Sequence, residues 1–184
     1  MRKIAIAFVA AFVAAFNLYA AELEGVKLPD TVQAGGTTLV LNGMGLRTKF
    51  IVKVYVAGLY LAQKSSDADA IVKADAPKRI VMQFVRSVSK KQIADGFSES
   101  FHDNAPDVEK TLKADIDRLM GVLEPLNEGD QMVFTYMPGS GTTFAMNGKD
   151  KLTVAGSAFG QVMFSVWLGL KPPTAALKKG LLGQ

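Results

Sequence analysis

The sequence predicts an α+β fold in which helices pack on an antiparallel sheet. The order of the patterns supports this prediction: strand patterns come first, helical patterns occupy the middle, a β-meander follows and helices close the chain. The middle segment carries apolar residues at helical spacing, as at Ile93, Phe97 and Phe101. Glycine turns at 138–141 and 147–148 punctuate the later strands, as is typical of a meander.

The first part of the chain after residue 21 is predicted to be mostly extended. Residues 22–34 form a polar lead-in, in which Pro29 excludes a continuous helix. After a glycine turn and a short strand, Asn42-Gly43 is a dipeptide typical of tight turns. Residues 46–61 form a long β-branched and aromatic run. We expect this run to be extended and to bend or form a hairpin near Thr48-Lys49.

The middle of the chain is predicted to contain three helices and one strand. A short helix begins after the capping residues 65–67 and ends at Lys73, and a strand follows at 79–85. Ser89 is the expected N-cap of a helix that runs through His102. Pro106-Asp107 is expected to open a longer helix that ends at Leu123.

The last third is predicted to form the meander and two closing helices. The meander strands are expected at 131–136, 142–146 and 152–154. An apolar helix is expected over 157–168. Thr174 is the expected N-cap of a final short helix that ends at Leu182.

The N-terminus has the three parts of a secretory signal peptide. Arg2 and Lys3 provide the positive region, Ile4–Phe16 is apolar and uncharged, and small residues end at Ala20. We therefore expect a signal peptide over residues 1–20 and a single domain over 21–184, exported in bacterial style to the periplasm. An uncleaved N-terminal anchor is the alternative. No later charge-free apolar run is long enough for a transmembrane segment after cleavage.

Composition excludes several classes of function. Without Arg2 and Lys3 the chain has 19 basic and 17 acidic side chains, a formal charge of +2, and no basic cluster interleaved with aromatics, so nucleic acid is not expected as a partner. Cysteine is absent, which excludes thiol catalysis and thiolate metal sites. His102 is the one histidine, and a solvated helix end is its expected place. We expect no cofactor and no metal.

Arg47 is the first candidate for a functional side chain. It lies where two glycine turns meet the apolar run, and a cation beside apolar surface is costly unless it gains an anion or hydrogen-bond acceptors. Alternation along the strand places Tyr55 on the same side. An arginine with a tyrosine hydroxyl could receive a carboxylate or phenolate. The alternatives are an arginine that reaches water or pairs with a carboxylate, and an ordinary cross-strand tyrosine.

At these residues the sequence resembles the chalcone isomerase-like family, most closely its bacterial exported branch. The resemblance is carried by Gly43-Met44-Gly45-Leu46-Arg47 and by Val54–Leu61, and continues through Phe84–Ser89, Ser157–Phe159 and Val166–Gly169. It covers essentially the whole chain from residue 23 to 183. The family implies an open-faced β-sandwich, in which a large antiparallel sheet is covered on one side by a layer of helices and a ligand cleft lies between them.

The resemblance also implies roles for particular positions. Arg47 matches the arginine that is central in the plant enzymes, which close a chalcone into a flavanone. The strand threonine of those enzymes falls on Tyr55, their helix Tyr and Asn fall near Ile93 and Ser100, and their late Thr falls near Val166. Most of the polar set of the enzymes is therefore replaced. The fatty-acid-binding branch of the family keeps the arginine and uses tyrosine to hold a carboxylate.

We therefore expect an exported, non-enzymatic binding protein for an amphipathic anion, most simply a fatty acid, held by Arg47 and Tyr55. One alternative is an intramolecular lyase or isomerase of chalcone-isomerase type, in which Arg47 would stabilise developing charge. A further alternative is a periplasmic interaction module without a ligand, in which Arg47 braces the turn. The candidate wall residues of the cleft are Ile93, Phe97, Ser100, Phe101, Phe159, Phe164 and Val166.

Overall fold

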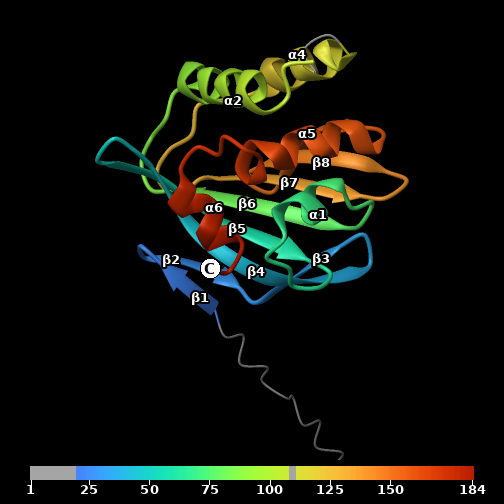
Figure 1. Cartoon of the computed structure of the whole chain (residues 1–184). Coiled ribbons are helices and arrows are strands. Elements are labelled where there is room, and N and C mark those ends of the chain that lie inside the picture. Colours follow the sequence, from blue (N-terminus) through green and yellow to red (C-terminus); the bar gives the residue numbers. More distant parts are fainter. Residues whose placement is uncertain (1–19, 108–110) are drawn as a thin grey trace, which may run out of the picture.

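A single curled sheet of seven antiparallel strands forms the body of the molecule (Figure 1). The computed structural model describes residues 20–107 and 111–184. Each strand of the sheet pairs with the next in sequence, so the order is β3-β4-β5-β6-β7-β8-β9. The strands are β3 (Thr31–Ala34), β4 (Thr37–Lys49), β5 (Val52–Leu61), β6 (Lys78–Phe84), β7 (Gln131–Met137), β8 (Gly141–Met146) and β9 (Lys149–Val154).

The helices pack on one face of this sheet. Their bounds are α1 (Ala68–Lys73), α2 (Lys90–Asn104), α4 (Lys113–Val122), α5 (Ser157–Leu168) and α6 (Ala175–Leu181). Buried side chains of α2, α5 and α6 join those of β5–β8 in one large apolar cluster. Helix α5 contributes most to it because its sequence is apolar on nearly every side. The α+β, open-faced prediction is confirmed.

The opposite face of the sheet is partly covered by a two-stranded sheet of β1 (Ala20–Leu23) and β2 (Val26–Pro29). Val26 and Leu28 pack there with residues of β4–β6 in a second apolar cluster. Tyr60 is fully buried in this cluster, and its hydroxyl donates to the Pro29 carbonyl at 2.8 Å. Among the described residues, Val26 is the first buried apolar side chain of the chain.

Helix α2 begins with a capping box. The Ser89 side chain accepts from the backbone N–H of Gln92, and the Gln92 side chain accepts from the backbone N–H of Ser89. Ile93, Phe97 and Phe101 follow at helical spacing and are buried. The expected N-cap and apolar stripe are confirmed, with the helix extending two residues beyond His102.

Strands β4 and β5 form a long hairpin whose loop is Phe50-Ile51. Lys49 pairs with Val52, and Arg47 pairs directly with Tyr55. A direct antiparallel pair lies on one face of a sheet with Cβ atoms about 5 Å apart. The hairpin alternative of the sequence prediction is therefore confirmed, with the turn two residues later than Thr48-Lys49.

The glycines of the Gly-x-Gly pair in β4 let a helix approach closely. A Cβ atom on Gly43 would overlap the carbonyl oxygen of Gly180, and one on Gly45 would lie 2.5 Å from the carbonyl oxygen of Leu177. Only glycine fits at both positions without moving α6. The pair is thus a packing device that seats α6 against the strand preceding Arg47.

Two local predictions were wrong: the turn at Asn42-Gly43 and the continuous helix from Asp107 to Leu123. Asn42-Gly43 is an irregularity within β4, because the Asn42 side chain donates to the carbonyls of Ser65 and Leu181. Residues 22–34 are largely strands, as the extended expectation for this part of the chain allows, since β2 and β3 find partners. The helix expected from Asp107 is described only from Lys113, with residues 108–110 outside the described residues. The signal-peptide prediction for residues 1–20 also lies almost wholly outside them. Among the described helices, none is long and apolar enough to cross a bilayer.

Candidate functional site

A cavity of about 410 Å³ lies between one end of the sheet and helix α2. Strands β4, β5, β6 and β7 provide its floor, while α2, the C-terminal turn of α5 and residues 171–173 provide its walls. The volume falls within the range of about 300–1,000 Å³ typical of small-molecule sites. The cavity is therefore large enough for a small organic ligand.

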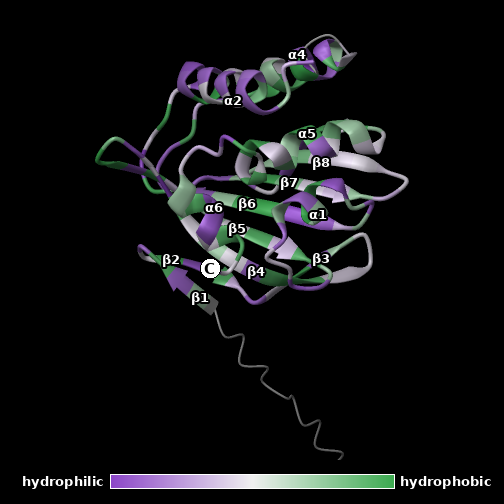
Figure 2. Cartoon of the chain, viewed as in Figure 1, coloured by the Kyte–Doolittle hydropathy of each residue, from purple (hydrophilic) through white to green (hydrophobic). Residues whose placement is uncertain are grey.

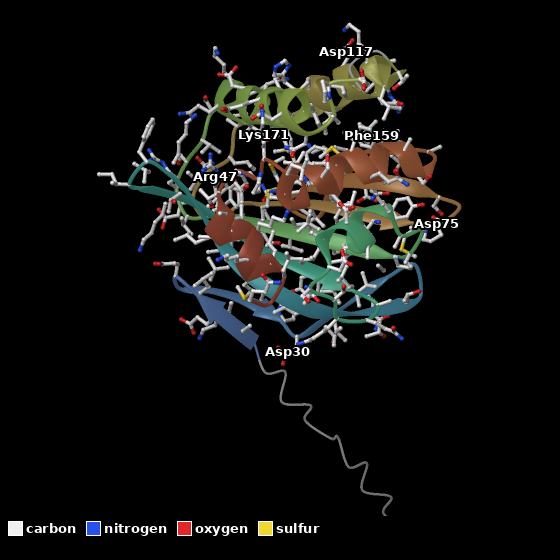
Figure 3. The ribbon with its side chains drawn as sticks, viewed as in Figure 1. Asp30, Arg47, Asp75, Asp117, Phe159 and Lys171 are labelled. Carbon is white, nitrogen blue, oxygen red and sulfur yellow. The ribbon has the colours of Figure 1, made fainter. Side chains whose placement is uncertain are left out.

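Arg47 lines this cavity and is half-buried. One of its Nη atoms donates to the backbone carbonyl of Thr48. In residues 20–107 and 111–184 no ion pair involves Arg47, so the expected alternative of a nearby Asp or Glu partner is absent there. Figure 3 shows Arg47 and Lys171 toward the same end of the molecule, away from Asp75. The guanidinium keeps donors that an anion in the cavity could accept.

Tyr55 faces the same cavity, next to Arg47 on the neighbouring strand. Its hydroxyl accepts a hydrogen bond from the indole Nε1 of Trp167 at 3.1 Å. Burial raises the pKa of Tyr55 to about 12, against lowering contributions from the Trp167 hydrogen bond and the Arg47 charge. The phenol is therefore protonated at neutral pH, and its proton is available to an acceptor.

The inner wall of the cavity is apolar. Met82 and Phe84 come from β6, Met132 from β7, and Ile93 and Phe97 from α2. All five side chains are buried. Val166 of α5 adds to this lining. An amphipathic ligand could bury its apolar part among these side chains and keep its polar head at Arg47 and Tyr55.

Charged side chains surround the mouth of the cavity. The cations are Arg47, Lys49, Arg86 and Lys171, and the carboxylates are Asp95, Glu99 and Asp103. Asp95 is paired with Lys91 at 2.7 Å, and Asp103 with Lys171 at 3.0 Å. Within the described parts of the chain, Arg86 and Lys49 take part in no ion pair. The unpaired charge at the mouth is thus predominantly positive.

The structure brings most of the sequence-predicted site residues together. Besides Arg47 and Tyr55, the cavity is lined by Ile93, Phe97, Ser100 and Val166. Phe101, Phe159 and Phe164 do not line it and are packed in the core. Phe101 stacks on Phe97, with ring centroids 5.9 Å apart. Helical periodicity identified buried aromatics but could not separate the cavity wall from the core.

Among the lining residues that were not proposed from the sequence, three carry polar or charged groups that bear on the site. Trp167 holds the Tyr55 hydroxyl, and Arg86 and Lys171 add charge at the mouth. Trp167 is the only tryptophan of the chain, which is a signal that could have drawn attention to it. Arg86 lies within the segment Phe84–Ser89 that carries the resemblance, but neither it nor Lys171 was singled out as a site residue. In the described residues no cluster of His, Cys, Asp and Glu could hold a metal ion, and His102 is exposed on α2.

Residues 20–183 match the profile of the family described as chalcone isomerase-like. The chain belongs to the chalcone isomerase-like family. Among solved structures, the fold is similar to that of a fatty-acid binding protein from Arabidopsis thaliana, with a TM-score of 0.66 and 16% sequence identity. The similarity covers 86% of this chain and 92% of the plant protein. A search of curated protein sequences found no match.

In this chalcone isomerase-like chain, the three positions that the resemblance matches to polar residues of the plant enzymes, Ile93, Ser100 and Val166, all line the cavity. Ile93 and Val166 present only hydrocarbon, and Ser100 is the one small polar side chain among the three. Neither Ile93 nor Val166 can donate a hydrogen bond to a ketone oxygen or hold a water molecule. The remaining polar centre is the group formed by Arg47, Tyr55 and Trp167.

Proposed function

We propose that this protein is an exported, non-enzymatic binding protein for a fatty acid or a similar amphipathic anion. The observation that carries the proposal is Arg47, a half-buried cation that has no carboxylate partner among the described residues and faces a cavity with apolar walls. The carboxylate would accept from Arg47 and from the Tyr55 hydroxyl, which Trp167 orients. Export to the periplasm is proposed from the sequence of residues 1–20 alone.

Most of the affinity would come from the tail of the ligand. Each buried methylene group stabilises the complex by roughly 0.8 kcal/mol, whereas a hydrogen bond to a charged group contributes roughly 1.5–3 kcal/mol. A chain of a dozen methylenes against Met82, Phe84, Phe97 and Met132 therefore outweighs the head-group contacts. The role of Arg47 and Tyr55 is to select an anion and to fix which end of the ligand faces the mouth.

The apolar character of Ile93 and Val166 favours binding over ring-closing catalysis. Catalysis of the ring closure of a chalcone requires groups that position a carbonyl oxygen and groups that stabilise charge as it develops. Arg47 could do the second of these, but the two positions expected for the first carry hydrocarbon side chains. Neither a phenolate at Tyr55 nor a histidine base is available, since the pKa of Tyr55 is raised to about 12 and His102 does not line the cavity.

Native mass spectrometry of the gently purified protein tests the proposal. A carrier is expected to retain added palmitate and to give a complex whose mass exceeds the apoprotein by one fatty acid. Palmitate methyl ester, which lacks the negative charge, should bind at least tenfold more weakly. Equal binding of acid and ester would contradict an anion site at Arg47, and absence of any palmitate complex would refute the proposed function.

A further inference from the structure

The tip of the β4–β5 hairpin is an exposed apolar feature that the core does not explain. Phe50 and Ile51 form its two-residue loop and are 93% and 96% exposed. Figure 1 shows this hairpin projecting beyond the neighbouring strands, and Figure 2 shows the hydrophobic colour of its tip. Two large apolar side chains in water at a projecting tip gain nothing for the stability of the fold.

The other two-residue hairpin loops of the described chain each contain glycine. They are Glu24-Gly25 between β1 and β2, Gly35-Gly36 between β3 and β4, and Asn147-Gly148 between β8 and β9. Each places both loop residues at positive φ, which favours glycine and asparagine. The β4–β5 loop has no glycine, places Phe50 at positive φ and carries two large apolar side chains, so the need to turn the chain does not explain its composition.

The backbone of the loop supports the same conclusion. Phe50 has a φ of 56°, in the left-handed region that bulky side chains rarely adopt. Glycine would relieve this strain at the first position of such a loop. The hairpin therefore keeps an unfavourable residue that is also fully exposed, and strain of this kind is characteristic of functional positions.

The surroundings of the tip indicate its partner. Lys49 precedes the apolar pair and takes part in no ion pair among residues 20–107 and 111–184, and Lys53 follows it, paired with Glu24 at 2.5 Å. Exposed Arg86 lies at the same cavity mouth as Lys49 and Phe50. An apolar tip flanked by cations matches a bilayer of anionic phospholipids, where the side chains enter the interface and the cations meet the head groups.

We propose that the β4–β5 hairpin inserts Phe50 and Ile51 into the surface of an anionic membrane. Phe50 also lines the cavity, so insertion would bring the mouth of the cavity to the bilayer surface. A lipid chain could then pass between bilayer and cavity without crossing bulk water. The proposal of a membrane contact is based on the hairpin alone. The proposal that this contact loads the cavity with lipid rests on the proposed function.

Co-sedimentation with vesicles tests the membrane contact. The protein from Ala21 onward is used, since every buried apolar residue described lies after this point and the apolar leader would itself bind lipid. We expect it to bind vesicles of phosphatidylglycerol and phosphatidylcholine, and to bind pure phosphatidylcholine at least tenfold more weakly. Binding to neither kind of vesicle would overturn the proposal.

Two variants and one control locate the contact. Ile51→Asp places a charge at the tip and should weaken vesicle binding at least tenfold. Phe50→Gly/Ile51→Ser removes the apolar pair without adding charge, and should weaken it as much while the melting temperature stays the same or rises. Ser140→Asp adds a charge to the β7–β8 turn at the opposite end of the sheet and should change nothing. Wild-type binding by both tip variants would overturn the assignment.

Two further measurements separate this proposal from others. Ile51 does not line the cavity, so Ile51→Asp should bind palmitate in solution with wild-type affinity. Vesicle binding without palmitate binding in the wild type would refute the carrier function and leave the membrane contact standing. Sedimentation velocity without lipid should give the same monomer mass for wild type and Ile51→Asp. A dimer that depends on Ile51 would assign the tip to a second copy of the chain instead.

Discussion

Replacement of Arg47 by alanine should weaken fatty-acid binding about 10- to 100-fold and leave the protein folded. The guanidinium is half-buried and has no ion-pair partner among the described residues, so a bound carboxylate would be its main acceptor besides the Thr48 carbonyl. A hydrogen bond to a charged group contributes roughly 1.5–3 kcal/mol. Since each 1.4 kcal/mol is about tenfold in Kd, the stated range follows.

The same contacts predict a small effect on stability. Arg47→Ala removes one hydrogen bond to a backbone carbonyl and no described ion pair, so the free energy of unfolding should fall by about 1 kcal/mol or less. Arg47→Lys keeps the charge but loses the planar fork, and should give an intermediate Kd. Titration calorimetry with palmitate below its micelle concentration measures the first effect, and urea denaturation measures the second.

Arg79→Ala is the matched control for this experiment. Arg79 is also a half-buried arginine of the sheet, but its Nε donates to Thr135 Oγ1 at 2.8 Å and it does not line the cavity. Its replacement should leave the Kd for palmitate unchanged. An Arg47→Ala protein that is folded and binds palmitate with wild-type Kd would refute the reasoning. So would an equal loss of affinity in Arg79→Ala.

Three other predictions concern the stability of the fold. Gly43→Ala should lower the free energy of unfolding by about 2 kcal/mol or more, because its methyl group would force α6 away from β4. Gly121 has open space around it, so Gly121→Ala should not lower the free energy of unfolding in this way. Lys78→Met should lower the free energy of unfolding, measured by urea denaturation, by roughly 2–3 kcal/mol, because the buried Lys78 ammonium donates to the carbonyls of Ile71, Val72 and Ala74. Lys64→Met, at an exposed position, is its control. Burial raises the pKa of Tyr60 to about 12, above its ordinary value of 10.0, so the folded state holds a proton that the unfolded state has lost between these pH values. The stabilising contribution of Tyr60 is complete below pH 10 and is lost as the pH rises toward 12. Between pH 10 and 12 the urea midpoint should therefore fall less steeply with pH in Tyr60→Phe than in the wild type. Equal dependence of the midpoint on pH in the two proteins would contradict this.

Sequence patterns predicted the fold well where local chemistry decides the structure. The apolar helix 157–168 and the Ser89 cap were predicted correctly because their determinants lie within a few residues. Asn42-Gly43 was predicted wrongly because its side chain is held by carbonyls of Ser65 and Leu181, which are distant in sequence. Local turn preference gives way when tertiary hydrogen bonds satisfy the same polar group.

The candidate site was predictable only in part for a similar reason. Arg47 and Tyr55 could be placed on one side of an extended segment by alternation, and the hairpin then made them direct neighbours. Phe97 and Phe101 have the same character in sequence, yet only Phe97 reaches the cavity. Which side of a helix faces the cavity depends on how the helices pack, and this packing cannot be predicted from the sequence of one segment alone.

Trp167 gives the protein an intrinsic optical reporter. It is the only tryptophan, it is almost fully buried, and its indole N–H is bonded to the hydroxyl of Tyr55 at the cavity. A ligand whose head group hydrogen-bonds to the Tyr55 hydroxyl would alter the electrostatic surroundings of the Trp167 indole. Occupancy should therefore change the emission spectrum of the unlabelled protein, and filling or emptying could be followed in real time by stopped-flow fluorescence.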